Sequence, residues 1–178
     1  MAKNVLILSG SPRKNGNSAA LCQQFAKGGE EAGNKVELIY LRDKKIGYCI
    51  ACYHCKKEGI CRIQDDMAEI LEKMDKADVI VLASPVYFYS INAQMKALID
   101  RVVARWLQIK NKDFYYIITA AEEESLVKDC TLEYMRGLAK CLKGSQEKGY
   151  IFGGGVYEPG KIKDTHFMQD AYDMGKRV

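Results

Sequence analysis

The sequence predicts an α/β domain in which five parallel strands form a doubly wound sheet with helices on both faces. Three observations lead to this fold class. Short apolar runs alternate with amphipathic stretches along the chain, residues 78–84 are almost entirely apolar, and no internal repeat or linker interrupts the alternation. Strands that alternate with helices are joined by right-handed crossovers, which place helices on both faces of a parallel sheet.

The first strand and the first helix are marked by clear boundaries. Residues 3–9 form a short apolar run that ends at Gly10 and Pro12, which is typical of a buried strand. The helical pattern at residues 17–32 has one face of small and apolar residues, and Gly33 ends it.

Two more strands and a helix follow in the first half of the chain. Residues 36–41 predict the second strand, and residues 65–75 predict a helix with an apolar stripe. Residues 78–84 predict the third strand, and their apolar composition fits the middle of a sheet that is covered on both faces.

The second half continues the alternation. An amphipathic helix has its apolar positions between Ile91 and Val103, and residues 114–119 predict the fourth strand. A helix at 123–142, a fifth strand at 149–152 and a final helix at 165–175 complete the pattern.

Bulk properties limit the function classes. A chain of 178 residues suits one domain with a full core, so we expect a single domain at 1–178 with a cysteine-rich insertion at 42–63. The net charge of +4 is too small to indicate a nucleic-acid partner. No apolar run is long enough for a bilayer and the first residues do not form a secretory signal, so we expect a cytoplasmic protein without a membrane partner.

The loop at residues 10–18 has the features of an anion-binding turn. It joins the first strand to the first helix, and the N–H groups at a helix N-terminus attract negative charge. Ser11, Asn17 and Ser18 add side-chain donors, and Arg13 adds a positive charge. The loop matches neither the P-loop nor the dinucleotide fingerprint. The alternative is that Asn17 or Ser18 only caps the helix.

A second loop, residues 84–90, follows the third strand. In the flavodoxin-like strand order 2-1-3-4-5, the first and third strands flank the point where the winding reverses, and ligands bind there. Pro85 stiffens this loop, and Tyr87 offers an aromatic surface to a ring system. One loop can therefore hold a phosphate and the other a ring. The alternative is an aromatic cluster that only covers the core.

At these two loops the chain resembles the NAD(P)H-dependent FMN reductase family, and specifically its iron–sulfur flavoprotein branch. The resemblance extends to residues 94–96, Asp100-Arg101, 154–160 and 171–175. It implies a flavodoxin-like domain that binds FMN and an NAD(P)H-dependent flavin oxidoreductase that passes electrons to a small-molecule or redox-protein acceptor. It also implies a homodimer or homotetramer.

The same resemblance implies a set of FMN-binding residues. The flavin carries the chemistry, so no side chain is expected to be catalytic. Tyr89 stands where the family commonly has glycine, and a bulky side chain there would narrow the space above the flavin. The implied cofactor-binding residues are Ser9, Ser11, Arg13, Asn15, Asn17, Ser18, Pro85, Val86, Tyr87, Phe88, Thr119 and Gly154.

Four of the seven cysteines form a compact block, Cys49-x2-Cys52-x2-Cys55-x5-Cys61. Three thiolates two residues apart with a fourth nearby can hold a cubane cluster, as in the ferredoxin spacing. The spacing is also similar to the motif of iron–sulfur flavoproteins, so these four residues are candidate ligands of a 4Fe-4S cluster. Structural zinc, redox-active thiols and a purely structural loop remain open as alternatives. We expect the other three to be buried small hydrophobic residues, namely Cys22, Cys130 and Cys141.

These observations leave three functions open. The first is an FMN-dependent oxidoreductase, although its use of NAD(P)H rests on the resemblance because the chain has no separate nicotinamide fingerprint. The second is an iron–sulfur flavoprotein electron carrier that ferredoxin reduces. The third is a non-enzymatic flavin- or zinc-binding module.

Overall fold

The structure is a computed structural model that describes residues 1–178. Five strands form a parallel sheet in the order β2-β1-β3-β5-β6, which confirms the predicted order 2-1-3-4-5. The strands are β1 (Asn4–Ser9), β2 (Lys35–Tyr40), β3 (Val79–Tyr87), β5 (Asp113–Thr119) and β6 (Gln146–Gly153).

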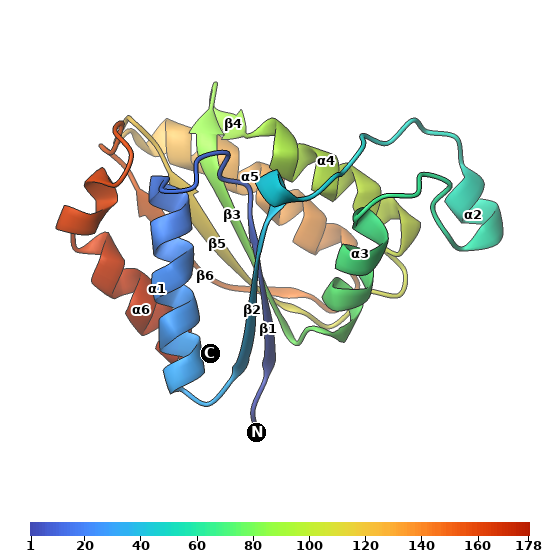
Figure 1. Cartoon of the computed structure of the whole chain (residues 1–178), viewed down its shortest axis with the longest axis horizontal. Helices are drawn as coiled ribbons and strands as arrows, with labels where there is room; N and C mark the ends of the chain where they lie inside the picture. The colour runs from blue at the N-terminus through green and yellow to red at the C-terminus, as the bar shows by residue number, and fades with distance from the viewer.

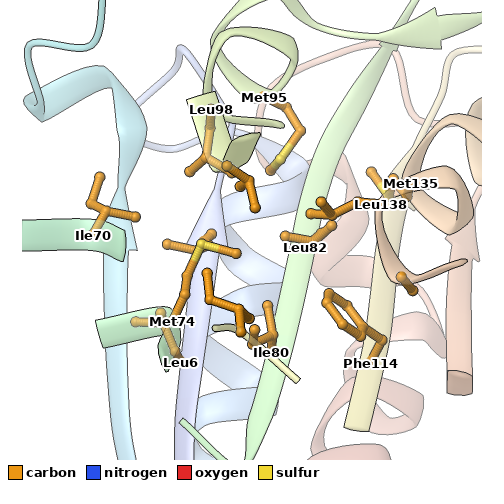
Figure 2. Packing of buried hydrophobic residues seen from close by; sticks show 14 of the residues in the cluster. Leu6, Ile70, Met74, Ile80, Leu82, Met95, Leu98, Phe114, Met135 and Leu138 are labelled. Carbon is orange, nitrogen blue, oxygen red and sulfur yellow. The ribbon is translucent and has the colours of Figure 1, made fainter. Parts of the chain in front are cut away.

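Helices cover both faces of this sheet (Figure 1). On one face lie α1 (Asn17–Glu31) and α6 (Phe167–Lys176), and on the other lie α3 (Met67–Lys76), α4 (Ala93–Arg101) and α5 (Ser125–Cys141). Each face has its own buried cluster. Figure 2 shows the larger one, in which Met74 of α3, Leu98 of α4 and Leu138 of α5 pack over the strands. No helix is both long and apolar enough to cross a bilayer.

The structure corrects the prediction of a loop at residues 84–90. β3 continues to Tyr87, and a short strand β4 (Ser90–Ile91) pairs antiparallel with its end. Phe88 and Tyr89 form the two-residue turn between them with φ of 49° and 61°. Such turns normally contain Asn or Gly, so two aromatic residues gave no hairpin signal in the sequence. Ile91 consequently belongs to β4 and not to the following helix.

Other differences between the predicted and the observed elements are smaller. β6 begins at Gln146, before the predicted start at 149, because its polar first residues pair with β5 at the exposed edge of the sheet. A five-residue helix α2 (His54–Glu58) was not predicted, since it is too short to show a periodic pattern. Three 3-10 helices complete the chain, namely η1 (Leu41–Asp43), η2 (Val102–Ala104) and η3 (Lys161–Asp164).

This arrangement sets the positions of both candidate sites. The carboxyl ends of β1, β3 and β5 meet the N-terminus of α1 at one edge of the sheet. The cysteine-containing segment leaves the end of β2 through η1 and extends sideways beyond α3 and α4 (Figure 1). The two predicted sites therefore occupy different parts of the molecule.

Candidate functional site

A pocket of about 340 Å³ opens at the carboxyl ends of the central strands. Both predicted loops contribute to it, and so does the end of β5. Of the sequence-predicted residues, it brings together Ser11, Arg13, Asn17, Ser18, Pro85, Val86, Tyr87, Phe88 and Thr119. Lining residues that the sequence did not indicate are Pro12, Gly16, Ala120, Ala121, Val156 and Tyr157.

Three predicted residues do not line this pocket. Ser9 is fully buried in β1, and its hydroxyl lies beside the thiol of Cys22. Asn15 is exposed on the outer side of the loop. Gly154 is buried against the segment at Glu122, where an added Cβ would approach the Glu122 carbonyl oxygen to 2.9 Å. These three residues therefore do not border the pocket.

The N-terminus of α1 forms the anion-binding part of the pocket. Gly16 precedes the helix, and no side chain caps it. The first N–H groups of the helix therefore have no partner within the helix and carry the positive end of its dipole. Ser11 Oγ donates to the Arg13 carbonyl oxygen at 3.1 Å, which shapes the turn in front of these N–H groups. The exposed Arg13 side chain adds a full positive charge.

Hydrogen bonds within the protein use both amide protons of Asn17 and one of the two protons of the Ser18–Thr119 hydroxyl pair. Asn17 Nδ2 donates to the carbonyl oxygens of Val156 at 2.9 Å and Glu158 at 3.0 Å, so both of its amide protons are used. Ser18 Oγ and Thr119 Oγ1 share a hydrogen bond of 2.7 Å. Asn17 can therefore offer an anion its backbone N–H but not its side chain, which holds the loop after β6 against the helix.

Asn92 links the two loops, and the sequence analysis missed it. Its Nδ2 donates to the Gly10 carbonyl oxygen, its backbone N–H donates to Ser84 Oγ at 3.0 Å, and its Oδ1 accepts the Met95 N–H at 3.3 Å. Asn92 is thus the N-cap of α4 and a brace between β1 and β3. An asparagine just before an amphipathic helix was the signal that would have found it.

The hairpin tip places aromatic side chains at the mouth of the pocket. Phe88 is fully exposed and borders the pocket, and Tyr89 is half-exposed but does not border it. We expected Tyr89 to narrow the space above the flavin, but Tyr89 is not among the residues that line the pocket. Both residues occupy the left-handed region, which costs free energy for bulky side chains and fixes where they stand.

Arg42, which the sequence analysis did not single out, adds a second guanidinium near the anion-binding turn. It belongs to η1, and its Nη1 donates to the Arg13 carbonyl oxygen at 3.4 Å. Its guanidinium lies 4.1 Å from the centre of the Tyr40 ring, which restricts its position. The loop between β1 and α1 is therefore braced from β2 as well as from α4.

The four cysteines of the block border a second pocket of about 370 Å³. Cys49 and Cys52 are exposed, Cys55 and Cys61 are half-buried, and all four are free thiols. No group of three or more His, Cys, Asp or Glu side chains is gathered closely enough to hold a metal ion. The donor set fits a cluster in its chemistry and in its shared pocket, but the thiols do not converge. Of the other three cysteines, Cys22 is buried as expected, Cys130 is half-buried and Cys141 is exposed.

Arg101, which borders this second pocket, forms a buried ion pair with Asp65. Arg101 Nη1 and Nη2 donate to the two Asp65 carboxylate oxygens at 2.8 and 3.0 Å. They also donate to the carbonyl oxygens of Gly47 at 2.8 Å and Ile63 at 3.3 Å. Arg101 therefore holds both ends of the segment that carries the cysteines.

This ion pair sets the pKa of Asp65. Burial acts to raise it, but hydrogen bonds from Arg101 and from the N–H groups of Gly47 and Met67 outweigh burial and hold the pKa below its ordinary value of 3.8. A carboxyl group whose pKa is lower in the folded chain stabilises the fold above its unfolded pKa and loses that contribution as the pH falls through the folded value.

We therefore expect acid to cancel the contribution of Asp65 to stability. Asp65→Asn should lower the free energy of unfolding by about 3 kcal/mol at neutral pH. That difference from the wild type should start to shrink below about pH 4, where the carboxyl group of the unfolded chain becomes protonated, and should be lost as the pH falls through the lower pKa of the folded chain. Urea unfolding followed by circular dichroism at several pH values measures both quantities. A difference that does not change with pH would contradict this assignment.

The sequence of this chain matches the family model described as NADPH-dependent FMN reductase over residues 3–125. It is 35% identical to an iron-sulfur flavoprotein of Methanocaldococcus jannaschii, over 98% of this chain and 94% of that protein. It is 33% identical to an iron-sulfur flavoprotein of Archaeoglobus fulgidus, over 95% of this chain and 76% of that one.

Solved structures support the fold. The structure is similar to an NAD(P)H:quinone oxidoreductase from Methanothermobacter marburgensis, with a TM-score of 0.82, 18% identity and coverage of 99% of this chain and 96% of that one. An azoreductase from Bacillus anthracis gives a TM-score of 0.77 at 15% identity, with full coverage of both chains. At these identities the similarity establishes the flavodoxin-like architecture alone.

Proposed function

This chain belongs to the NADPH-dependent FMN reductase family, and from that premise we propose that it oxidises NAD(P)H and passes the electrons through FMN to a small-molecule or redox-protein acceptor. One observation carries the proposal. A single pocket combines an uncapped helix N-terminus with an aromatic hairpin, which are the two kinds of surface that a flavin mononucleotide requires.

The residues of this pocket divide between the two ends of FMN. The N–H groups of the first turn of α1, together with the Arg13 guanidinium, would bind the phosphate, and the Ser11 hydroxyl, which donates to the Arg13 carbonyl oxygen, would shape the turn. Pro85 to Phe88 would lie against the ring system, with Thr119 beside Pro85 on the neighbouring strand β5. When bound, FMN would accept a hydride from NAD(P)H and release electrons to the acceptor. The hydrogen bonds made by Asn92 and Arg42 would hold the phosphate site and the ring site at a fixed position relative to each other.

The mouth of the pocket supplies a surface for a second flat ring. Phe88 and Tyr157 both border the pocket with exposed aromatic side chains. A nicotinamide ring that approaches the flavin would enter between them, and their apolar surface would exclude water from the approach.

Anaerobic addition of NADPH or NADH to the FMN-loaded protein tests this function. We expect the yellow absorbance of the flavin to be lost on addition of at least one of the two, because the proposed FMN pocket is bordered by the exposed side chains of Phe88 and Tyr157, where a nicotinamide could approach. Flavin that stays oxidised with both cofactors but is reduced by ferredoxin would contradict the NAD(P)H proposal. That result would instead indicate the electron carrier.

The cysteine pocket favours the second candidate function, an electron carrier that exchanges electrons with a redox protein. We propose that Cys49, Cys52, Cys55 and Cys61 hold a 4Fe-4S cluster, supported by their ferredoxin-like spacing and by the pocket that they share. A cluster held there would supply single-electron transfer, which suits exchange with a redox protein. The basic side chains of Lys56, Lys57 and Arg62 on the same segment would attract an acidic partner.

Assembly of several copies would bring the two sites closer. Within one chain the cysteine segment extends away from the edge of the sheet that holds the FMN pocket (Figure 1), and the two pockets share no lining residue. Exposed Tyr48, Ile50 and Tyr53 on this segment give it an apolar surface. We propose a homodimer or homotetramer in which this segment packs against a neighbouring copy.

A further inference from the structure

We propose that Arg101 is a positioning residue for the cysteine pocket that raises the reduction potential of the cluster held there. This inference rests on the proposed cluster and deepens it. It concerns a residue of α4 that lies outside the cysteine motif and that contacts both the fold and the pocket.

The first observation is the burial of an uncommon charge. The Arg101 side chain is 1% exposed, which makes it the largest fully buried side chain of the chain. A buried guanidinium is retained only where it is paired and hydrogen-bonded. Asp65 supplies the counter-charge in a two-pronged pair, and the carbonyl oxygens of Gly47 and Ile63 accept the remaining Nη protons.

The second observation is a donor that the fold leaves unused. Arg101 Nε is buried and has no hydrogen-bond partner. Few buried donors in native proteins lack a partner, so each one calls for an explanation, such as an ion or a group that binds there. Asp65 and the two carbonyl oxygens explain the rest of the guanidinium, and they do not explain this N–H.

The third observation is what lies beside it. Arg101 and all four cysteines, Cys61 among them, line the same pocket. A cysteine thiolate that binds iron still accepts hydrogen bonds at sulfur. We assign a thiolate of this shared pocket as the acceptor of the unused N–H.

The effect on the cluster follows from charge. Reduction adds one electron, and therefore one negative charge, to a cluster that is already anionic with its four thiolates. A nearby positive charge and a hydrogen bond to a ligand sulfur both stabilise the reduced form more than the oxidised form. Arg101 thus raises the midpoint potential, and Asp65, on its other side, acts in the opposite direction.

The test compares variants of Arg101 and Asp65, which should shift the midpoint potential of the cluster in opposite directions. The full-length protein is reconstituted anaerobically with iron and sulfide and titrated with dithionite, which supplies the electron, while the cluster is followed by electron paramagnetic resonance. We expect Arg101→Gln to lower the midpoint potential of the cluster and Asp65→Asn to raise it. Both variants break the same ion pair, so a residue with a purely structural role would produce equal losses of iron or shifts of the same sign.

A matched control and a milder variant complete the design. Arg62 borders the same pocket but is exposed and makes no hydrogen bond within the protein, so Arg62→Gln should shift the potential far less than Arg101→Gln. Arg101→Lys keeps the charge and a partner for Asp65, and it gives a readout if Arg101→Gln does not fold. It should retain the cluster and shift the potential in the same direction by a smaller amount.

The outcomes separate the two proposals. A wild-type protein that binds no iron overturns the cluster and the role of Arg101 together. A wild-type protein that binds the cluster, with potentials that do not change or that change in one direction in both pair variants, overturns the role of Arg101 alone. Shifts of opposite sign support it.

Discussion

Gly16→Asp is expected to weaken FMN binding by about 100-fold, because it places a carboxylate where the phosphate would lie. Gly16 precedes the first turn of α1 with φ of −73° and ψ of 157°, a conformation that any residue adopts. Aspartate is a favoured N-cap, so its own carboxylate would accept the free N–H groups of the helix. Loss of two charge-assisted hydrogen bonds to the phosphate, at about 1.5 kcal/mol each, corresponds to about 100-fold in affinity. Quenching of FMN fluorescence by the apoprotein measures this change.

Gly16→Ala is the control for the volume that any side chain adds at this position. An added Cβ would lie 2.5 Å from Ser11 Oγ, so the serine side chain must move in both variants. Only aspartate adds a negative charge, and alanine should therefore lose far less affinity. Thermal unfolding of both variants establishes that the fold is intact. Equal loss of affinity in the two variants would show that crowding, and not competition for the anion site, is responsible.

Cys55→Ser is expected to reduce iron incorporation by at least about 100-fold and to leave FMN binding unchanged. A serine hydroxyl is a poor ligand for a cluster at neutral pH, and loss of a direct ligand should exceed the roughly 10- to 100-fold cost of losing a supporting contact. FMN should still bind, because the two pockets share no lining residue. Iron analysis and the absorbance spectrum of anaerobically reconstituted protein measure both properties.

Cys141→Ser is the matched control, because Cys141 is exposed on α5 and does not border the cysteine pocket. It should bind as much iron as the wild type. Iron that is unaffected by Cys55→Ser would remove this residue from the ligand set. A colourless wild-type protein with one zinc ion per chain would replace the cluster with a structural zinc site.

Together these two variants would establish that the sites are independent. Gly16→Asp should leave iron incorporation unchanged, and Cys55→Ser should leave FMN affinity unchanged. Such a result would fit two pockets that share no lining residue.

The strands of the parallel sheet could be predicted because their signals are local, whereas their order was taken from the flavodoxin-like pattern. The apolar run that begins β3 and the Gly10 turn after β1 are properties of a few neighbouring residues. The same holds for the anion-binding turn, since a glycine-rich loop between a strand and a helix places free N–H groups at its end wherever the helix lies. The four cysteines were also identified by spacing alone.

The tertiary structure decided which donors are free and which are used. Asn17 and Ser18 look alike in the sequence as phosphate donors, but their partners at Val156 and Thr119 lie more than a hundred positions away along the chain. Asn92 became visible as the brace between the two loops only when β1 and β3 were placed side by side.

Contacts between residues far apart along the chain also decided what surrounds the cysteine pocket. The spacing of the four cysteines indicates four ligands. No local pattern shows that Arg101, forty positions beyond Cys61, borders the same pocket with one N–H unused. Local composition therefore determined the strands, the turn and the thiols of this protein. Long-range hydrogen bonds and burial, which depend on how the helices pack on the sheet, determined what each polar side chain is free to bind.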